Sequence, residues 1–123
     1  MGRAVAESLA KEVARVAVLA RNQKELRQVV DALGDLGSPD ALGIPTDLTS
    51  WEAVESAFDA VGKKWGALNV LVNAAGPVDV GIGSFEQIDD VEWHDTFDIG
   101  TLSAVRSVRA ALPSCGWRRG GAS

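Results

Sequence analysis

Tyrosine is absent from this chain of 123 residues, and cysteine and histidine occur once each. With Cys115 alone no internal disulfide can form, which favours a free thiol in a reducing compartment. His94 has no second histidine or cysteine at ligand spacing, so neither a metal site nor a Cys–His catalytic pair is expected. No apolar run reaches the ~18 residues of a membrane span, and no signal peptide opens the chain. We therefore expect no membrane partner and a cytoplasmic location.

The composition is that of one soluble domain. Hydrophobic residues make up 46% and charged residues 24% of the chain, a balance typical of globular proteins rather than disordered ones. The net charge of −5 and the pI near 4.7 argue against nucleic acid as the main partner. The length allows one domain and not two.

Apolar periodicity alternates between helical and strand-like along the chain. Val5, Leu9 and Val13 form one helical stripe, whereas the β-branched run at 15–20 has no helical period. Asn22 followed by Glu25 is typical of a helix start. The same reading predicts further elements along the chain. They are strands at 15–20, 40–45 (weak) and 68–72, and helices at 3–13, 22–33, 51–65, near 85 and from about 92 to 112.

This alternation predicts a parallel α/β sheet with crossover helices, a Rossmann-type three-layer α/β/α fold. We place that domain at residues 1–113 and an irregular tail at 114–123. Ligands of such sheets bind at the carboxyl ends of the strands. Chemistry is therefore expected in the loops after Ala20, Pro45 and Val72.

Residues in those loops resemble the short-chain dehydrogenase/reductase (SDR) family. The strongest element is Asn69-Val-Leu-Val-Asn-Ala-Ala-Gly76, a strand that ends in Asn-x-Ala-Gly. Asp47-Leu48 and Arg21-Asn22 follow two other strands, and Gly2 stands at the start of the first helix. The resemblance covers the chain from Met1 to about Leu112.

The resemblance implies an NAD(P) site. In the family, an Asp at position 47 accepts a hydrogen bond from the adenine amino group, and the backbone of Leu48 lies beside the base. The helix start at Gly2 would face the pyrophosphate. Arg21 favours NADP(H) over NAD(H), because a cation can pair with the 2′-phosphate. The residues expected to bind the cofactor are Gly2, Arg21, Asn22, Asp47, Leu48, Asn73, Ala74, Ala75 and Gly76.

Other positions depart from the family pattern. The family's catalytic group is an Asn on the long helix, a Ser, and Tyr-x-x-x-Lys, in which Tyr and Lys handle a proton while the cofactor passes a hydride. Gly100 stands where the Asn is expected, and no tyrosine is present. We expect the first strand, most of the phosphate loop and the C-terminal half of the fold to be missing, so that the chain is truncated at both ends. A frameshift or an early stop would explain the tail after Pro113.

Three functions remain open on the sequence alone. The first is a piece of an NADP(H)-dependent carbonyl/alcohol oxidoreductase that has no activity by itself, so whether the chain is an enzyme stays uncertain. The second is a non-catalytic dinucleotide-binding module. The third is an interaction module that forms a homo-oligomer through the helix around Leu102–Leu112. For Leu102, Val105 and Val108 on that helix, burial against the chain's own sheet is the favoured interpretation. The substrate cannot be read from these residues.

Overall fold

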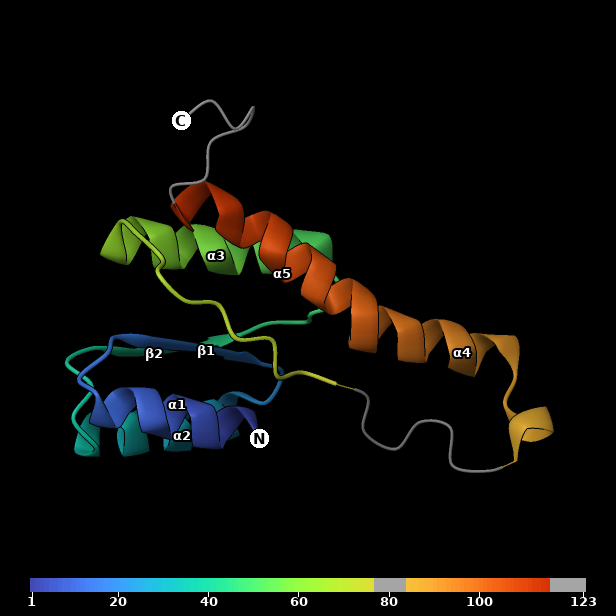
Figure 1. The fold of residues 1–123 in the computed structure, drawn as a ribbon, viewed down its shortest axis with the longest axis horizontal. Coiled ribbons are helices and arrows are strands. Elements are labelled where there is room, and N and C mark those ends of the chain that lie inside the picture. The colour runs from blue at the N-terminus through green and yellow to red at the C-terminus, as the bar shows by residue number, and fades with distance from the viewer. Residues whose placement is uncertain (77–83, 116–123) are drawn as a thin grey trace.

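The sheet has two parallel strands, β1 (Val16–Ala20) and β2 (Ala41–Pro45), in a computed structural model that describes residues 1–76 and 84–115 (Figure 1). Val16 lies opposite Ala41, and Ala20 lies opposite Pro45. The crossover between the strands is helix α2 (Gln23–Asp35). Because both strands point the same way, the loops that follow Ala20 and Pro45 leave the sheet at the same edge.

Helices cover both faces of this sheet. Figure 1 shows α1 (Gly2–Lys11) and α2 on one face, and α3 (Trp51–Trp65) and α5 (Ser103–Ala111) beyond the other. Two helices begin at side-chain caps. Asn22 Oδ1 accepts a hydrogen bond from the Glu25 amide, as the sequence predicts, and the Ser50 side chain accepts one from the Ala53 amide. The α/β/α prediction is confirmed as a partial fold.

One core lies between α1, α2 and β1. Its buried members are Ala6 and Ala10 of α1, Val16 of β1 and Leu33 of α2. The two alanines let α1 approach its neighbours closely, and larger side chains such as Leu9 and Val29 close the margins.

A second core joins α3 to α5. The buried residues of α3 are Val54, Ala57 and Val61, and those of α5 are the small residues Ser103, Ser107 and Ala111. The interpretation that Leu102, Val105 and Val108 pack on the chain's own sheet is therefore wrong. All three are more than 40% exposed. Small residues face α3 because they permit close helix packing, which turns the larger apolar side chains outward.

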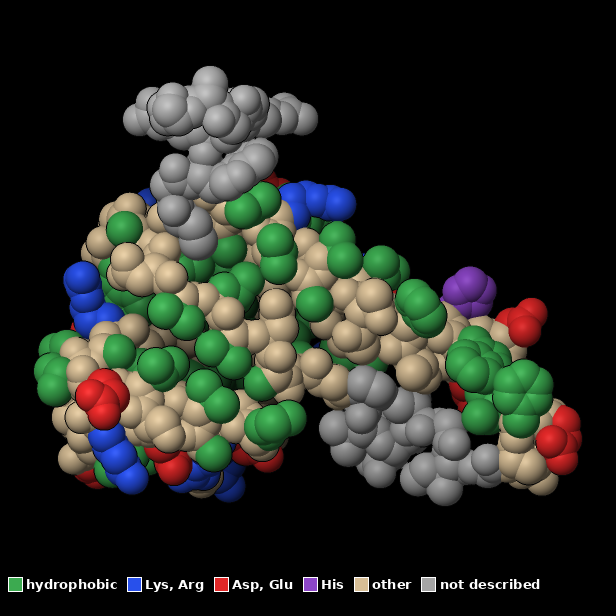
Figure 2. Space-filling view, viewed as in Figure 1, with side chains coloured by type: hydrophobic (Ala, Val, Ile, Leu, Met, Phe, Trp, Pro, Cys, Tyr) green, Lys and Arg blue, Asp and Glu red, His purple; other side chains and the backbone are tan. Residues whose placement is uncertain are grey.

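The long C-terminal helix is confirmed, with an interruption. It comprises α4 (Asp90–Phe97), a π-helical turn η2 (Asp98–Leu102) and α5, and short 3₁₀ turns flank it at Phe85–Gln87 (η1) and Leu112–Cys115 (η3). Asp89 and Glu92 form a reciprocal capping box at its start. Helix α4 projects from the body, and the exposed His94, purple in Figure 2, lies on it. Most of the expected tail, residues 116–123, lies outside the described residues.

The predicted strand at 68–72 does not form. Within the described residues this segment joins neither β1 nor β2, and its one backbone bond to a distant element runs from the Leu68 amide to the Ser114 carbonyl (3.0 Å). A strand is stable only when its backbone groups hydrogen-bond to a neighbouring strand. In the doubly wound order that neighbour would be a strand lying between this segment and β1. Val70 and Val72 are consequently exposed.

Across the described residues, no helix has both the length and the apolar character to cross a membrane.

Helix α1 ends earlier than its apolar stripe predicts. The helix stops at Lys11, and Val13 adopts a left-handed conformation with φ of 64°. The Ala14 amide then bonds the Leu9 carbonyl and the Val13 amide bonds that of Ala10, which is a Schellman cap. Helix α2 ends in the same way, with Gly37 in the equivalent place. A β-branched residue is strained where glycine is normally found.

Asp40 anchors the opposite edge of the sheet, where the strands begin. Its Oδ2 accepts a hydrogen bond from Trp65 Nε1 (2.8 Å) and lies 3.5 Å from Lys64 Nζ. The Arg15 guanidinium lies 5.8 Å from the centroid of the Trp65 ring. The Trp65 hydrogen bond, helped by Lys64 and Arg15 and opposed by partial burial, lowers the pKa of Asp40 below its ordinary 3.8. This cluster ties the end of α3 to the start of β2.

Replacing Val13 with glycine should stabilise the fold. Gly adopts a positive φ without a Cβ penalty, and the relief exceeds its extra chain entropy, so we expect the free energy of unfolding to rise by about 1 kcal/mol. Thermal melting of Val13→Gly measures the change. The matched control is Gly37→Ala, which places a Cβ at the equivalent cap and should lower the melting temperature. A melting temperature of Val13→Gly below that of the wild type would contradict the strain.

Asp40→Asn should destabilise the fold in a pH-dependent way. Because the folded-state pKa is lowered, the carboxylate contributes stability above about pH 3.8, and this contribution is lost as pH falls through the folded pKa. Melting curves should show a lower melting temperature for Asp40→Asn at pH 7 and a gap that closes towards pH 2. Asp31→Asn on the exposed side of α2 is the control. A gap that is the same at every pH would refute the ionic contribution.

Candidate functional site

The candidate site lies at the carboxyl edge of the two strands. Figure 1 shows the start of α1, the ends of β1 and β2, and the segment that reaches Gly76 meeting at this edge. Arg21 follows β1 and Asp47 follows β2, and their Nη2 and Oδ1 atoms are 3.1 Å apart. Two predicted site residues, 26 positions apart in sequence, are therefore in direct contact.

Asp47 is held by three hydrogen bonds that all end on Oδ1. They come from the Thr49 hydroxyl (2.6 Å), the Thr49 amide (3.0 Å) and Arg21. The two Thr49 bonds contribute most and Arg21 adds to them; together they lower the pKa of Asp47 below 3.8, although desolvation opposes the shift. The group is an anion at neutral pH, and among the described residues none donates to Oδ2. That oxygen is available to an additional donor.

Leu48 is fixed through its backbone. Its carbonyl accepts a hydrogen bond from Arg106 Nη1 of α5 at 3.0 Å. Asn22, by contrast, uses its side-chain oxygen to cap α2. Its part in binding a cofactor stays a prediction.

Gly2 and Ala74 bring the first helix to the loop after residue 72. A Cβ built on Gly2 would lie 3.1 Å from the Ala74 Cβ, which is tighter than ordinary van der Waals contact. Glycine here and a small residue at 74 are thus what lets the start of α1 approach the Asn73–Gly76 loop. All four residues of that loop are exposed, so a flat ligand could reach their backbone.

Gly100 lies within the π turn η2 and is exposed. It offers no side chain where the resemblance implies an Asn. Next to it, Asp98 pairs with Arg106 at 2.5 Å. π turns within helices occur often at functional sites, because they displace the backbone from the regular helix.

Sequence reasoning missed Arg106 and Thr49. Arg106 contacts Leu48, which lies 58 positions away in sequence, and no local sequence pattern predicts such a contact. Thr49 could have been found, because Asp followed two residues later by Thr is a common side-chain-to-backbone turn.

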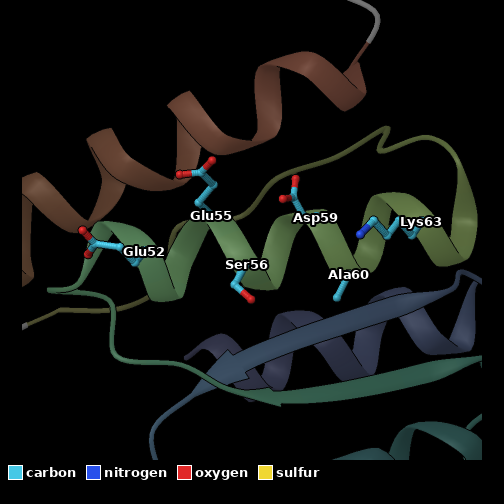
Figure 3. A pocket seen from close by; sticks show the side chains of 6 residues that line it. All are labelled: Glu52, Glu55, Ser56, Asp59, Ala60 and Lys63. Carbon is cyan, nitrogen blue, oxygen red and sulfur yellow. The ribbon is translucent and has the colours of Figure 1, made fainter.

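A shallow groove runs along the exposed side of α3, away from these residues (Figure 3). Glu55 and Asp59 point away from the sheet, whereas Ser56 and Ala60 point towards it. None of the predicted site residues lines this groove, and no cluster of metal-ligating side chains occurs within residues 1–76 and 84–115. The acidic residues there form a solvated helix face.

Comparison with known proteins identifies the family of the chain. Residues 1–122 match the sequence model of the short chain dehydrogenase family. 11-beta-hydroxysteroid dehydrogenase A of Sesamum indicum is 31% identical over 114 residues, which are 92% of this chain and 32% of that protein.

Solved structures give the same picture. A crystal structure of actinorhodin polyketide ketoreductase with NADPH has a TM-score of 0.84 and 31% identity, covering 92% of this chain and 42% of that one. NAD⁺-bound xylitol dehydrogenase has a TM-score of 0.85 and 25% identity over 92% and 43%. The chain thus spans less than half the length of these relatives. Since the family model matches almost every residue, the chain belongs to the short-chain dehydrogenase/reductase family.

Proposed function

We propose that this chain is the dinucleotide-binding part of an NADP(H)-dependent carbonyl/alcohol oxidoreductase, and that the 123 residues alone turn over no substrate. The contact between Arg21 and Asp47 carries the proposal. It places a cation and an anion with complementary roles towards an adenosine phosphate at the ligand-binding edge of the sheet.

In the proposed complex, different residues of the site would contact different parts of the dinucleotide. Asp47 Oδ2 would accept from the adenine amino group, with the Leu48 backbone beside the base. The start of α1 at Gly2 would face the pyrophosphate with backbone N–H groups, and Asn73–Gly76 would lie along the cofactor. Asn22 stands next to Arg21 at the end of β1, but its side-chain oxygen already caps α2.

Arg21 supports NADP(H) as the preferred cofactor. Its side chain is 73% exposed, so a 2′-phosphate can reach the guanidinium without displacing protein atoms. Asp47 keeps its two bonds from Thr49 if Arg21 turns to a phosphate, so the loop does not depend on the ion pair. Related structures contain either NADPH or NAD⁺, so the proposed preference rests on Arg21.

The proposed lack of turnover follows from the chemistry the family pattern requires. Proton transfer there needs a Tyr assisted by a Lys, and this sequence has no tyrosine. Gly100 supplies no amide at the Asn position. The chain can therefore position a nicotinamide cofactor but lacks the acid that completes hydride transfer to a carbonyl.

Titration of the chain with NADPH and NADH tests the proposal. We expect saturable NADPH binding, read from tryptophan fluorescence, and roughly tenfold weaker NADH binding, the difference expected for one charge-assisted contact. Arg21→Glu should abolish this preference. Absorbance at the NADPH band with simple carbonyl substrates should show no oxidation above background.

Arg27→Glu is the matched control, because it makes the same charge change on the exposed side of α2 without touching Asp47. It should keep the preference. Equal affinity for both cofactors in the wild type would refute the NADP(H) assignment, absence of any binding would refute the dinucleotide site, and turnover above background would refute the inactivity.

A second proposal is self-association through α5. Leu102 at the end of η2 and Val105 and Val108 of α5 lie on one side of the long helix. All three are exposed because α3 contacts the opposite, small-residue side. In Figure 2 hydrophobic side chains are visible along the same helix. Such a stripe matches itself in a second copy related by a two-fold axis.

Sedimentation at several concentrations tests the self-association. We expect a dimer whose fraction rises with concentration, and Val105→Glu should shift the equilibrium to the monomer, because it would bury two unpaired carboxylates at the contact. Val13→Glu makes the same change at the exposed cap that follows α1, in the opposite layer, and should leave the dimer intact. A wild type that stays monomeric at every concentration would contradict the proposal.

A further inference from the structure

We propose that Arg106 is a positioning residue that locks the Asp47–Leu48 loop to the π turn η2, so that a ligand on the loop and the backbone around Gly100 keep one fixed arrangement. The inference deepens the proposed function and rests on it for the identity of the ligand. The coupling between loop and turn concerns the chain's own residues and can be tested without a ligand.

Two contacts of one side chain carry the inference. Arg106 Nη1 donates to the Leu48 carbonyl at 3.0 Å, and Nη2 lies 2.5 Å from Asp98 Oδ1. The first contact is a hydrogen bond and the second is an ion pair, and the Arg106 side chain is only 16% exposed, so both contacts are largely shielded from water. A charge-assisted hydrogen bond in such a place is stronger than a neutral, exposed one.

Only an arginine can make both contacts at once. The guanidinium is a rigid, planar fork with five N–H donors, so one side chain can serve a carboxylate and a carbonyl in fixed relative positions. Helical side chains lean towards the helix N-terminus, which carries Arg106 from α5 back towards Asp98 in η2. Asp98 therefore orients the fork, and the other half of the fork holds Leu48.

The contact is not needed to pack α5. That helix is seated on α3 by Ser103, Ser107 and Ala111, and Arg109 adds a contact at 5.4 Å from the Trp51 ring centroid. Arg106 instead reaches past α3 to the loop in front of it. In Figure 1 this loop, which leaves β2, rises to the start of α3 beneath the junction of η2 and α5.

The consequence concerns both ends of a bound cofactor. Asp47 and Leu48 are the residues placed at the adenine, whereas Gly100 stands at a position that the family uses for catalysis. Arg106 joins the two through its hydrogen bond to Leu48 and its ion pair with Asp98. Movement of the loop on ligand binding would therefore be transmitted to the π turn.

Hydrogen exchange of the full chain tests the coupling directly. The Thr49 and Ser50 amides are hydrogen-bonded within the loop, so their exchange rates report its opening. Arg106→Met should speed their exchange roughly tenfold. Asp98→Ala should speed it roughly threefold, although Asp98 does not touch the loop, because the fork loses its orientation. Arg106→Lys should not restore protection, since a single ammonium cannot make both contacts.

Arg109→Met is the matched control on the same helix and should leave the Thr49 and Ser50 rates unchanged. Unchanged rates in Asp98→Ala would overturn the coupling, and so would equal acceleration in Arg109→Met, which would indicate a merely structural role. If Arg106→Met fails to fold in melting experiments, Asp98→Ala and Arg106→Lys decide the question.

Titration with adenosine 2′,5′-bisphosphate separates this inference from the proposed function. Wild-type binding with a roughly tenfold loss in Arg106→Met supports both. Wild-type binding with no loss in that variant overturns the positioning role. A wild type that binds none of this probe refutes the dinucleotide site, and the exchange rates then decide the coupling alone.

Discussion

Backbone pairing between β1 and β2 is the constraint on which the candidate site depends. Because the strands run in parallel and in register from Val16 opposite Ala41 to Ala20 opposite Pro45, Arg21 and Asp47 emerge side by side. The helices then complete the site from two directions: α1 brings Gly2 to Ala74, and α5 brings Arg106 to Leu48. Each of these approaches needs a particular side chain, a very small one at position 2 and a forked cation at position 106.

Local interactions were predictable from the sequence, because their partners lie a few residues apart. The cap at Asn22 forms as the pattern indicates, and the long C-terminal helix is present. The strand expected at 68–72 fails for a non-local reason, since a β-branched run becomes a strand only beside a partner. The prediction that the apolar stripe of the C-terminal helix is buried is wrong for a related reason. Which side of a helix is buried depends on the element that packs against it, and here α3 packs against the two serines and the alanine of α5.

The candidate site divides in the same way. Arg21 and Asp47 were expected together, because topology alone sends the ends of parallel strands to one edge. The role of Arg106 was not expected, because its contact with Leu48 spans 58 positions and produces no periodic pattern in the sequence. Gly100 falls within the π turn, so the departure from the family pattern coincides with a departure from regular helix geometry.

The segment from Ala67 to Gly76, which joins neither strand of the described sheet, also affects how long the chain survives in a cell. Proteases bind their substrates as extended strands and need backbone groups that are not already paired. The exposed valines at positions 70 and 72 offer apolar side chains beside such a backbone. We expect cleavage there to set the lifetime of the polypeptide, without any need for the whole fold to open first.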